Sequence, residues 1–166
     1  MAAQLDDTVV RGSFRITEGN TVTLPTGAVA GAAIAGGVTA EKVKQRVVER
    51  HSQDGTAASQ TIGIHRADGA GLVHSFLVWF AEAKNSGAAT VTIDLKKNGS
   101  TILTAVITTD STTPAAINTD VDGTFSGTPS YADGDHFTAE IVATAGGGTL
   151  GTGLSVEAVF IEEYAG

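Results

Sequence analysis

A stretch of small, mostly apolar residues lies near the start of this chain. It runs from residue 18 to residue 42 and reads EGNTVTLPTGAVAGAAIAGGVTAEK. Its side chains are too small to bury much apolar surface, so folding it alone would not offset the entropy lost on ordering the backbone. Gly and Ala at this density let one backbone lie close against another. The stretch therefore indicates an arm that orders on a partner, either copies of itself or a larger surface.

Length and composition limit the part of the chain beyond the arm. A chain of 166 residues predicts one domain with an extension, and 5% aromatic residues allow only a small core. The absence of Cys excludes disulfides and thiolate metal sites and fits synthesis in a reducing cytosol. We expect no signal peptide, because no basic segment precedes an apolar one at the N-terminus. We expect no membrane span, because the weakly polar run over 27–38 is shorter than the roughly 20 residues required.

The charge is unevenly distributed along the chain. Residues 1–66 hold 7 Lys and Arg against 6 Asp and Glu, whereas residues 67–166 hold 3 against 12, within a net charge of −8. Such an acidic region repels phosphate backbones, which argues against nucleic acid as a partner. Solubility alone would explain the acidity. A near-neutral arm that docks, with an acidic head that faces water, would explain it equally well.

From about residue 44 the chain reads as short strands with turns every 8–12 residues. One helical turn near 39–43 and then a strand over about 44–52 are favoured for the start of this region. The later strand candidates are 61–65, 72–80, 91–97, 100–108, 135–143 and 154–162. Seven or eight such strands are typical of a β-sandwich or jelly roll. The sequence therefore predicts an all-β protein with an extended N-terminal arm over 1–42 and a β-sandwich or jelly-roll domain over 43–166.

Within the arm, residues 5–24 alternate loosely between apolar and polar positions. They read as short extended strands. Three pairings stay open for them: the sheet of their own domain, the sheet of a partner, or both.

Asn98 and Gly99 give the strongest local signal, because both tolerate positive φ and they separate two alternating segments. They predict a β-hairpin. Its first strand should turn Val91, Ile93 and Leu95 toward the core and Thr92, Asp94 and Lys96 outward. Two alternatives stay open for the second strand. A two-residue loop would bury Ile102 and Val106, whereas a three-residue loop with a bulge would bury Leu103 and Ile107, since a slip of one residue reverses the face.

Several patterns resemble ligand sites. The segment GGGTLG over 146–151 matches G-x-G-x-x-G, but a strand pattern follows it instead of a helix, so a hairpin loop with close backbone approach is favoured. Acidic pairs at Asp120 and Asp122, and at Asp133 and Asp135, offer oxygen ligands of the kind Ca²⁺ takes. Their spacing does not fit the helical calcium loop, and Asp commonly forms turns. We expect no metal site and no cofactor.

The histidines and aromatic residues give weak signals. The four histidines are dispersed, at His51, His65, His74 and His136. His65 and His74 could face each other across neighbouring strands, although two imidazoles alone make a poor zinc site. Trp79 lies in the most apolar run and is expected in the core. Tyr131 and Tyr164 are better candidates for exposed contacts.

Nothing in the chain points to catalysis. There is no Cys nucleophile and no G-x-S-x-G elbow, so we expect no enzyme and predict no catalytic residue. A small hydrolase would rest only on the presence of carboxylates. The residues predicted as exposed loop contacts are Asp120, Asp122, Tyr131 and Asp133.

Three segments together resemble a known class of protein. Residues 24–42 contain LP-x-G-A-V and then A-x-I-A-x-x-V-T-A-E-K, which resembles the N-terminal thread of tailed-phage virion proteins. The hairpin VTIDLKKNGSTIL over 91–103, and YADGD over 131–135 before a strand, are similar to the β domains of phage head fibres, capsid decoration proteins and some tail appendages. The resemblance covers most of the chain from about residue 20.

The resemblance implies a small β-sandwich or jelly-roll head, frequent trimerisation, and an N-terminal part that fixes the protein to the particle. We therefore expect a structural virion protein, assembled in the host cytoplasm, that decorates or cements the capsid as a homotrimer. Its partners would be its own copies and the major capsid protein or another virion protein, with no membrane and no nucleic acid. The arm residues expected to bind are Leu24, Pro25, Val29, Ile34, Val38 and Val43. The alternative is a tail appendage or a receptor- or carbohydrate-binding module, and the choice between head and tail stays open.

Overall fold

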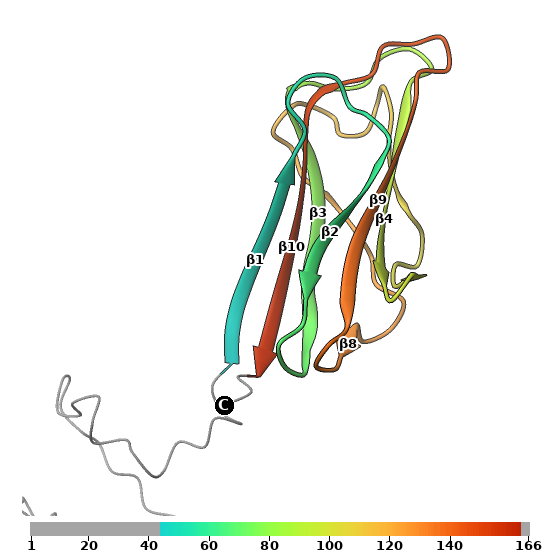
Figure 1. Ribbon diagram of the computed structural model, residues 1–166. Helices are drawn as coiled ribbons and strands as arrows, with labels where there is room; N and C mark the ends of the chain where they lie inside the picture. Colours follow the sequence, from blue (N-terminus) through green and yellow to red (C-terminus); the bar gives the residue numbers. More distant parts are fainter. Residues whose placement is uncertain (1–43, 164–166) are drawn as a thin grey trace, which may run out of the picture. The chain divides into compact units, whose positions relative to one another are not determined.

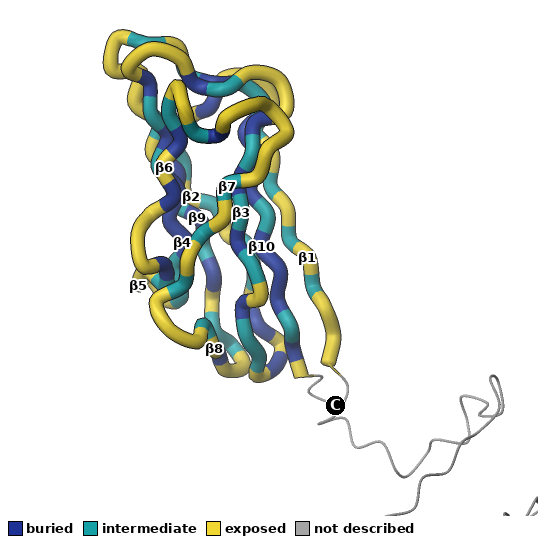
Figure 2. The backbone as a smooth tube through the Cα atoms, turned by 180° about the vertical axis from the view of Figure 1, so that it is seen from behind, coloured by how far each residue is buried: buried dark blue, intermediate teal, exposed yellow. Residues whose placement is uncertain are grey.

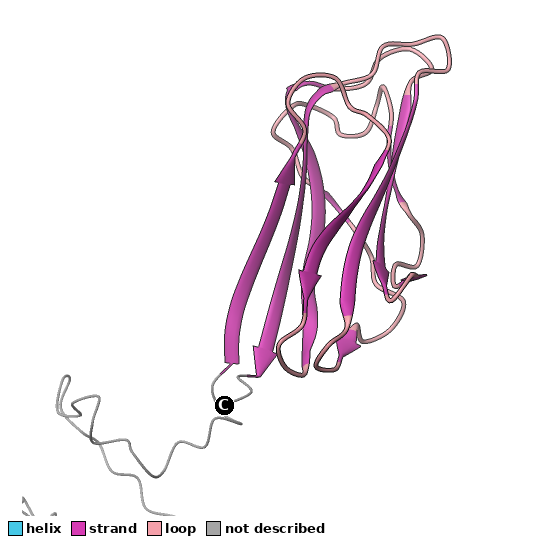
Figure 3. Cartoon of the chain, in the orientation of Figure 1, coloured by secondary structure: helices cyan, strands magenta, loops and turns pink. Residues whose placement is uncertain are grey.

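A computed structural model of the chain describes residues 44–163. The described part is built from strands and loops, with ten strands in two sheets (Figures 1 and 3). The strands are β1 (Lys44–Ser52), β2 (Gln60–Arg66), β3 (Gly71–Ala83), β4 (Thr90–Lys97), β5 (Ser100–Thr101), β6 (Ile107–Thr109), β7 (Val121–Asp122), β8 (Ser130–Tyr131), β9 (His136–Thr144) and β10 (Thr152–Glu163). Within this part, no helix has the length and apolarity that crossing a membrane requires.

The all-β sandwich prediction is confirmed. One sheet has the order β1-β10-β3-β7, with β8 also paired to β3, and the other has the order β2-β9-β4-β5, with β6 also paired to β4. Every strand pair is antiparallel. The helical turn predicted near 39–43, the binding residues of the arm from Leu24 to Val43, and Tyr164 lie outside the described residues.

The core fills the space between the two sheets. Buried residues alternate with more exposed ones along much of the long strands, as a pleated strand with one face on a core requires (Figure 2). The largest fully buried side chains of the described part are Phe76, Phe80, Phe137, Phe160, Ile93, Leu95, Ile141 and Leu154. Burying each such side chain contributes roughly 1.5–3 kcal/mol, so a few large residues stabilise a core that is otherwise rich in Val and Ala.

The hairpin at residues 90–101 is present as predicted, and its loop has two residues, one of the two lengths left open. Lys97 pairs with Ser100, and the two loop residues between them, Asn98 and Gly99, have φ of 50° and 82°. These positive φ angles belong to the turn type whose twist matches that of the flanking strands. The Asn-Gly prediction is therefore confirmed.

The strand after the hairpin loop follows neither of the two alternatives completely. Leu103 and Ile107 are buried, while Val106 is 44% exposed, although the loop has two residues. The reason is that β5 ends at Thr101 and the chain rejoins β4 only at β6, where Ile107 lies opposite Ile93. Both alternatives assumed one continuous strand, and the irregular segment over 102–106 breaks that assumption.

Two other predictions of orientation need correction. Trp79 is half-buried on the outer face of β3, opposite Ser155, and the Arg50 guanidinium lies 4.9 Å from its ring centroid. Its placement in the core was wrong, because the core-facing residues of this run are Val73, Phe76, Val78 and Phe80, and Trp79 lies between two of them on the opposite face. Asp94, expected to face outward, is only 8% exposed, because β5 brings the Thr101 hydroxyl within 2.5 Å of its carboxylate.

The glycine-rich segment over 146–151 connects the two sheets. It leads from β9 in one sheet to β10 in the other, so the expected hairpin loop was wrong. The close backbone approach is present, since Ser86 and Thr149 form a bridge with a 2.9 Å N···O hydrogen bond. A strand follows the segment, as the alternation after it predicted.

Candidate functional site

A pocket of about 710 Å³ opens at one side of the sandwich, where the edge strands β1 and β2 lie across from each other. We call it the lateral pocket. Its walls carry the carboxylates of Glu49, Asp68, Glu162 and Glu163 and one guanidinium, that of Arg66. Val47 and Ile64 supply apolar surface. The pocket therefore presents negative charge over an apolar base.

A β-bulge in β2 places His65 inside this pocket. The pairing with β9 shifts between Gly63↔Thr138 and His65↔Phe137, which leaves Ile64 as an extra residue. His65 consequently points inward and stacks on Phe160, with ring centroids 4.2 Å apart. The expectation that His65 and His74 face each other was wrong, because β2 and β3 belong to different sheets.

His65 connects two carboxylates from different strands. Its Nε2 lies 2.7 Å from Oε1 of Glu162, and its Nδ1 lies 3.7 Å from Oε1 of Glu49. The side chains of His65 and Glu162 are about nine-tenths buried. A buried carboxylate is tolerated when it is hydrogen-bonded, and His65 supplies that bond. Sequence reasoning missed this pair, although alternation along β10 puts Glu162 on the same face as the buried Ala158 and Phe160 and puts Glu163 on the other face.

A row of paired residues extends from Glu162 to Tyr131. Glu162 pairs with Gly71, and Gly71 pairs with Tyr131. The Tyr131 ring passes so close to Gly71 that a Cβ atom on the glycine would lie 2.6 Å from the phenol oxygen. Burial, with the nearby negative charge of Glu162, raises the pKa of the Tyr131 hydroxyl well above its ordinary value.

Tyr131 therefore differs from its prediction as an exposed loop contact. It is 6% exposed, and its ring packs edge-on against Phe137 at 5.1 Å. The reason is that β8 pairs with the first residues of β3 and Tyr131 packs into the core, against a phenylalanine of each sheet. Asp120, Asp122 and Asp133 are exposed, as predicted, and their role as contacts stays a prediction.

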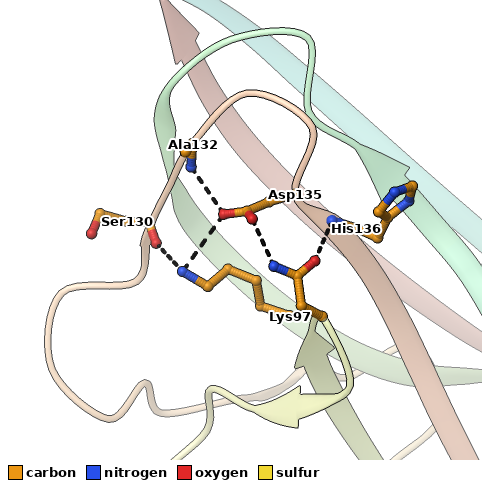
Figure 4. Close-up of polar contacts among 6 residues, drawn as sticks. Lys97, Ser130, Ala132, Asp135 and His136 are labelled. Atoms are coloured by element: carbon orange, nitrogen blue, oxygen red, sulfur yellow. Dashed lines mark hydrogen bonds and ion pairs between the residues drawn. The ribbon is translucent and has the colours of Figure 1, made fainter.

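Asp135 joins the hairpin turn to the loop before β9. Its carboxylate accepts hydrogen bonds from the Ala132 N–H at 2.9 Å and the Asn98 amide at 2.7 Å, and Lys97 Nζ lies 3.7 Å away (Figure 4). The bond from Ala132 and then that from Asn98 lower the pKa of Asp135 below its ordinary value. Asp135 thus stabilises a turn, and no group of three His, Cys, Asp or Glu residues in the described part is arranged to hold a metal ion.

We expect Asp135→Asn to lower stability at neutral pH, because the charged acceptor of these bonds is lost. A depressed folded-state pKa means that the stabilisation is complete above the unfolded carboxyl pKa of about 3.9 and is lost as pH falls through the folded value. The gap between the two proteins should therefore close in acid. Urea unfolding of both from pH 7 downward measures it, with Asp133→Asn as the exposed control. A gap that stays constant with pH would contradict the assigned role.

Comparison with known proteins gives distant structural likenesses. No protein-family model matches the chain, and no curated protein sequence matches it. A chain of the cyanophage Pam1 capsid asymmetric unit is similar with a TM-score of 0.45 and 12% identity, over 72% of this chain and 84% of that one.

Two further solved structures are similar at lower TM-scores. A chain from Bacillus endospore appendages, described as disulfide-linked pili, has a TM-score of 0.32 and 16% identity, over 76% of this chain and 96% of that one. A chain of infectious bursal disease virus Gt strain has a TM-score of 0.34 and 14% identity, over 75% of this chain and 37% of that one. Similarity at this level gives no argument about function. A proposal for the function must therefore rest on the residues of the chain itself.

Proposed function

We propose that this protein is a structural virion protein of a tailed phage that decorates or cements the capsid as a homotrimer. Residues 1–42 would bind the particle and hold the copies together, and the sandwich would project as the head. The protein would assemble in the host cytoplasm and act without catalysis. Its partners would be its own copies and the major capsid protein or another virion protein.

The observation that supports this proposal is that the two ends of the sandwich differ. Lys44, where the head begins, pairs with Glu163, so the arm must join the head at the end where β10 finishes (Figure 1). Loops gather at the opposite end, where Ala57 bonds to Gly151 and Lys84 bonds to Ser111. A head attached at one end presents the other end to the surroundings.

The composition of the arm suits self-association. Val29, Ile34 and Val38 of three copies would be buried about a common axis, and the intervening Gly and Ala would let the backbones approach closely. Closed threefold symmetry also matches the local threefold positions of a capsid. Three linked arms raise the overall affinity even when each arm binds weakly, because the second and third contacts become intramolecular.

We expect deletion of residues 1–40 to abolish binding to particles while the head stays folded, because the head would lose its attachment. Co-sedimentation with particles that lack the protein measures binding, and circular dichroism checks the fold. Ile117→Ser serves as the control, since it changes an exposed residue at the loop end and keeps the arm. A truncated head that still decorates particles would refute attachment through the arm.

The alternative, a receptor- or carbohydrate-binding module on a tail appendage, has less support. Such a module predicts an exposed aromatic or Asp-rich patch on loops 110–135. Tyr131 is buried, so an aromatic patch there is lost, whereas Asp120, Asp122 and Asp133 are exposed. Trp79 is half-exposed, but the Arg50 guanidinium covers its ring. A glycan array probed with the full chain separates the two functions, because a decoration protein should bind none of the glycans.

A further inference from the structure

We infer that the free edge of β1 receives an extended segment, residues 12–20, from a second copy of this chain, with Arg15 entering the lateral pocket. This inference deepens the proposed function and rests on its self-association. If correct, the inference means that this part of the alternating segment over 5–24 joins the sheet of a partner copy. The occupant is a named part of the chain, so each of its contacts can be tested.

The first support is the unpaired edge of β1. Within the described residues, the backbone of β1 pairs only with β10 and that of β2 only with β9. Side chains connect β1 to β2, as in the contacts of His51 with Gln60 and of Glu49 with His65, and the lateral pocket opens between the two strands. Alternate residues of β1 therefore direct backbone N–H and C=O groups to an edge where no described strand pairs with them. Such an edge is a template for strand addition, in which main-chain bonds give affinity and alternate side chains give specificity.

The second support is the match of charge on the inner side. The side chains of β1 that face the pocket are Gln45, Val47 and Glu49, and the nearby carboxylates of Glu162 and Asp68 make the pocket acidic. An antiparallel strand that places Arg15 opposite Glu49 puts its guanidinium into this negative field. Oppositely charged pairs across neighbouring strands are favourable.

The third support is that the same register matches the outer side of β1. With Arg15 opposite Glu49, Ile16 falls opposite Val48, which is 42% exposed. Glu18 then falls opposite Arg46, and Phe14 opposite Arg50. One antiparallel register therefore provides two oppositely charged pairs, one apolar pair and one arginine–aromatic pair. A parallel strand with Arg15 opposite Glu49 would lose the pair of Glu18 with Arg46.

Length and composition favour donation between copies. Residues 21–43 link the segment to β1, and 23 residues can extend to roughly 75 Å at about 3.3 Å each, which is enough to reach a neighbour. The small side chains of this link suit packing against other copies. Head-to-tail donation around three copies closes into a ring, so every β1 edge is covered.

Cysteine cross-linking in the free protein tests the inference, because the natural chain has no Cys. Ile16→Cys chains mixed with Val48→Cys chains should give a disulfide-linked dimer under mild oxidation. Val142→Cys is the matched control, since this valine is 46% exposed on a strand of the other sheet. We expect at least tenfold more heterodimer with Val48→Cys than with Val142→Cys.

Equal yields for the two mixtures, or no dimer, would overturn the inference. A chain that carries both Ile16→Cys and Val48→Cys and forms only an internal disulfide would overturn donation between copies. Arg15→Glu should reduce cross-linking by at least tenfold, and Glu49→Arg in the receiving chain should restore it. The cross-linking test uses no particles. If cross-linking fails while deletion of residues 1–40 still abolishes particle binding, the inference is wrong and the proposed function stands.

Discussion

Gly71→Ala is expected to lower the free energy of unfolding by about 3 kcal/mol, because the site has no room for a methyl group. A Cβ atom there would lie 2.3 Å from the Ile161 carbonyl oxygen and 2.6 Å from the Tyr131 ring. The carbonyl belongs to the neighbouring strand and cannot rotate away. The Tyr131 ring is packed edge-on against Phe137 and Phe160, which oppose its displacement toward the core.

A second strand glycine provides the matched control for this variant. A Cβ atom on Gly63 in β2 meets nothing within 4 Å, so Gly63→Ala should leave stability unchanged or raise it by about 0.5 kcal/mol. Urea unfolding followed by tryptophan fluorescence compares the two variants with the parent. Equal stabilities for Gly71→Ala and Gly63→Ala would show that the row from Tyr131 to Glu162 is not packed as described.

Phe160→Ala is expected to cost about 3–5 kcal/mol, the range found when a buried aromatic ring is removed and a cavity remains. Phe160 is fully buried at the centre of an aromatic cluster. Its ring centroid lies 4.2 Å from that of His65, 4.9 Å from that of Phe137 and 5.9 Å from that of Tyr131. Removing the Phe160 ring therefore takes away a packing partner that three other rings share, and these three rings come from different strands.

Calorimetry and urea unfolding measure the loss, and Val142→Ala is the control for a half-exposed strand position, with an expected change within about 0.5 kcal/mol. The His65 ring protons should also shift in the NMR spectrum, because the stacked ring is gone. A cost below about 1 kcal/mol for Phe160→Ala would mean that the cluster is not part of the core.

The parts of the fold that the sequence predicted depend on local signals. Alternation places β1, β2, β3, β4, β9 and β10 close to their observed bounds, and Asn98 with Gly99 fixes the hairpin loop. Burial of Leu103 and Ile107 was one of the two alternatives, but its combination with a two-residue loop matched neither of them. That outcome depends on where the chain leaves the sheet and rejoins it, and alternation carries no information about such breaks.

The lateral pocket escaped prediction for a similar reason. A bulge at Ile64 turns His65 inward, and only the partner strand β9 reveals that bulge. Glu162 lies opposite Gly71 of β3, and His65 of β2 bonds to its buried carboxylate. These causes join three strands that lie far apart along the chain, so no window of sequence contains them together.

Self-association through the arm is the central claim, and the solution mass of the full-length protein tests it most directly. Sedimentation equilibrium should give three times the 16.8 kDa mass of one chain. Arg15→Glu, which opposes the strand exchange at β1, should lower that mass. A full-length protein that sediments as a single 16.8 kDa chain across the concentration range would contradict the account.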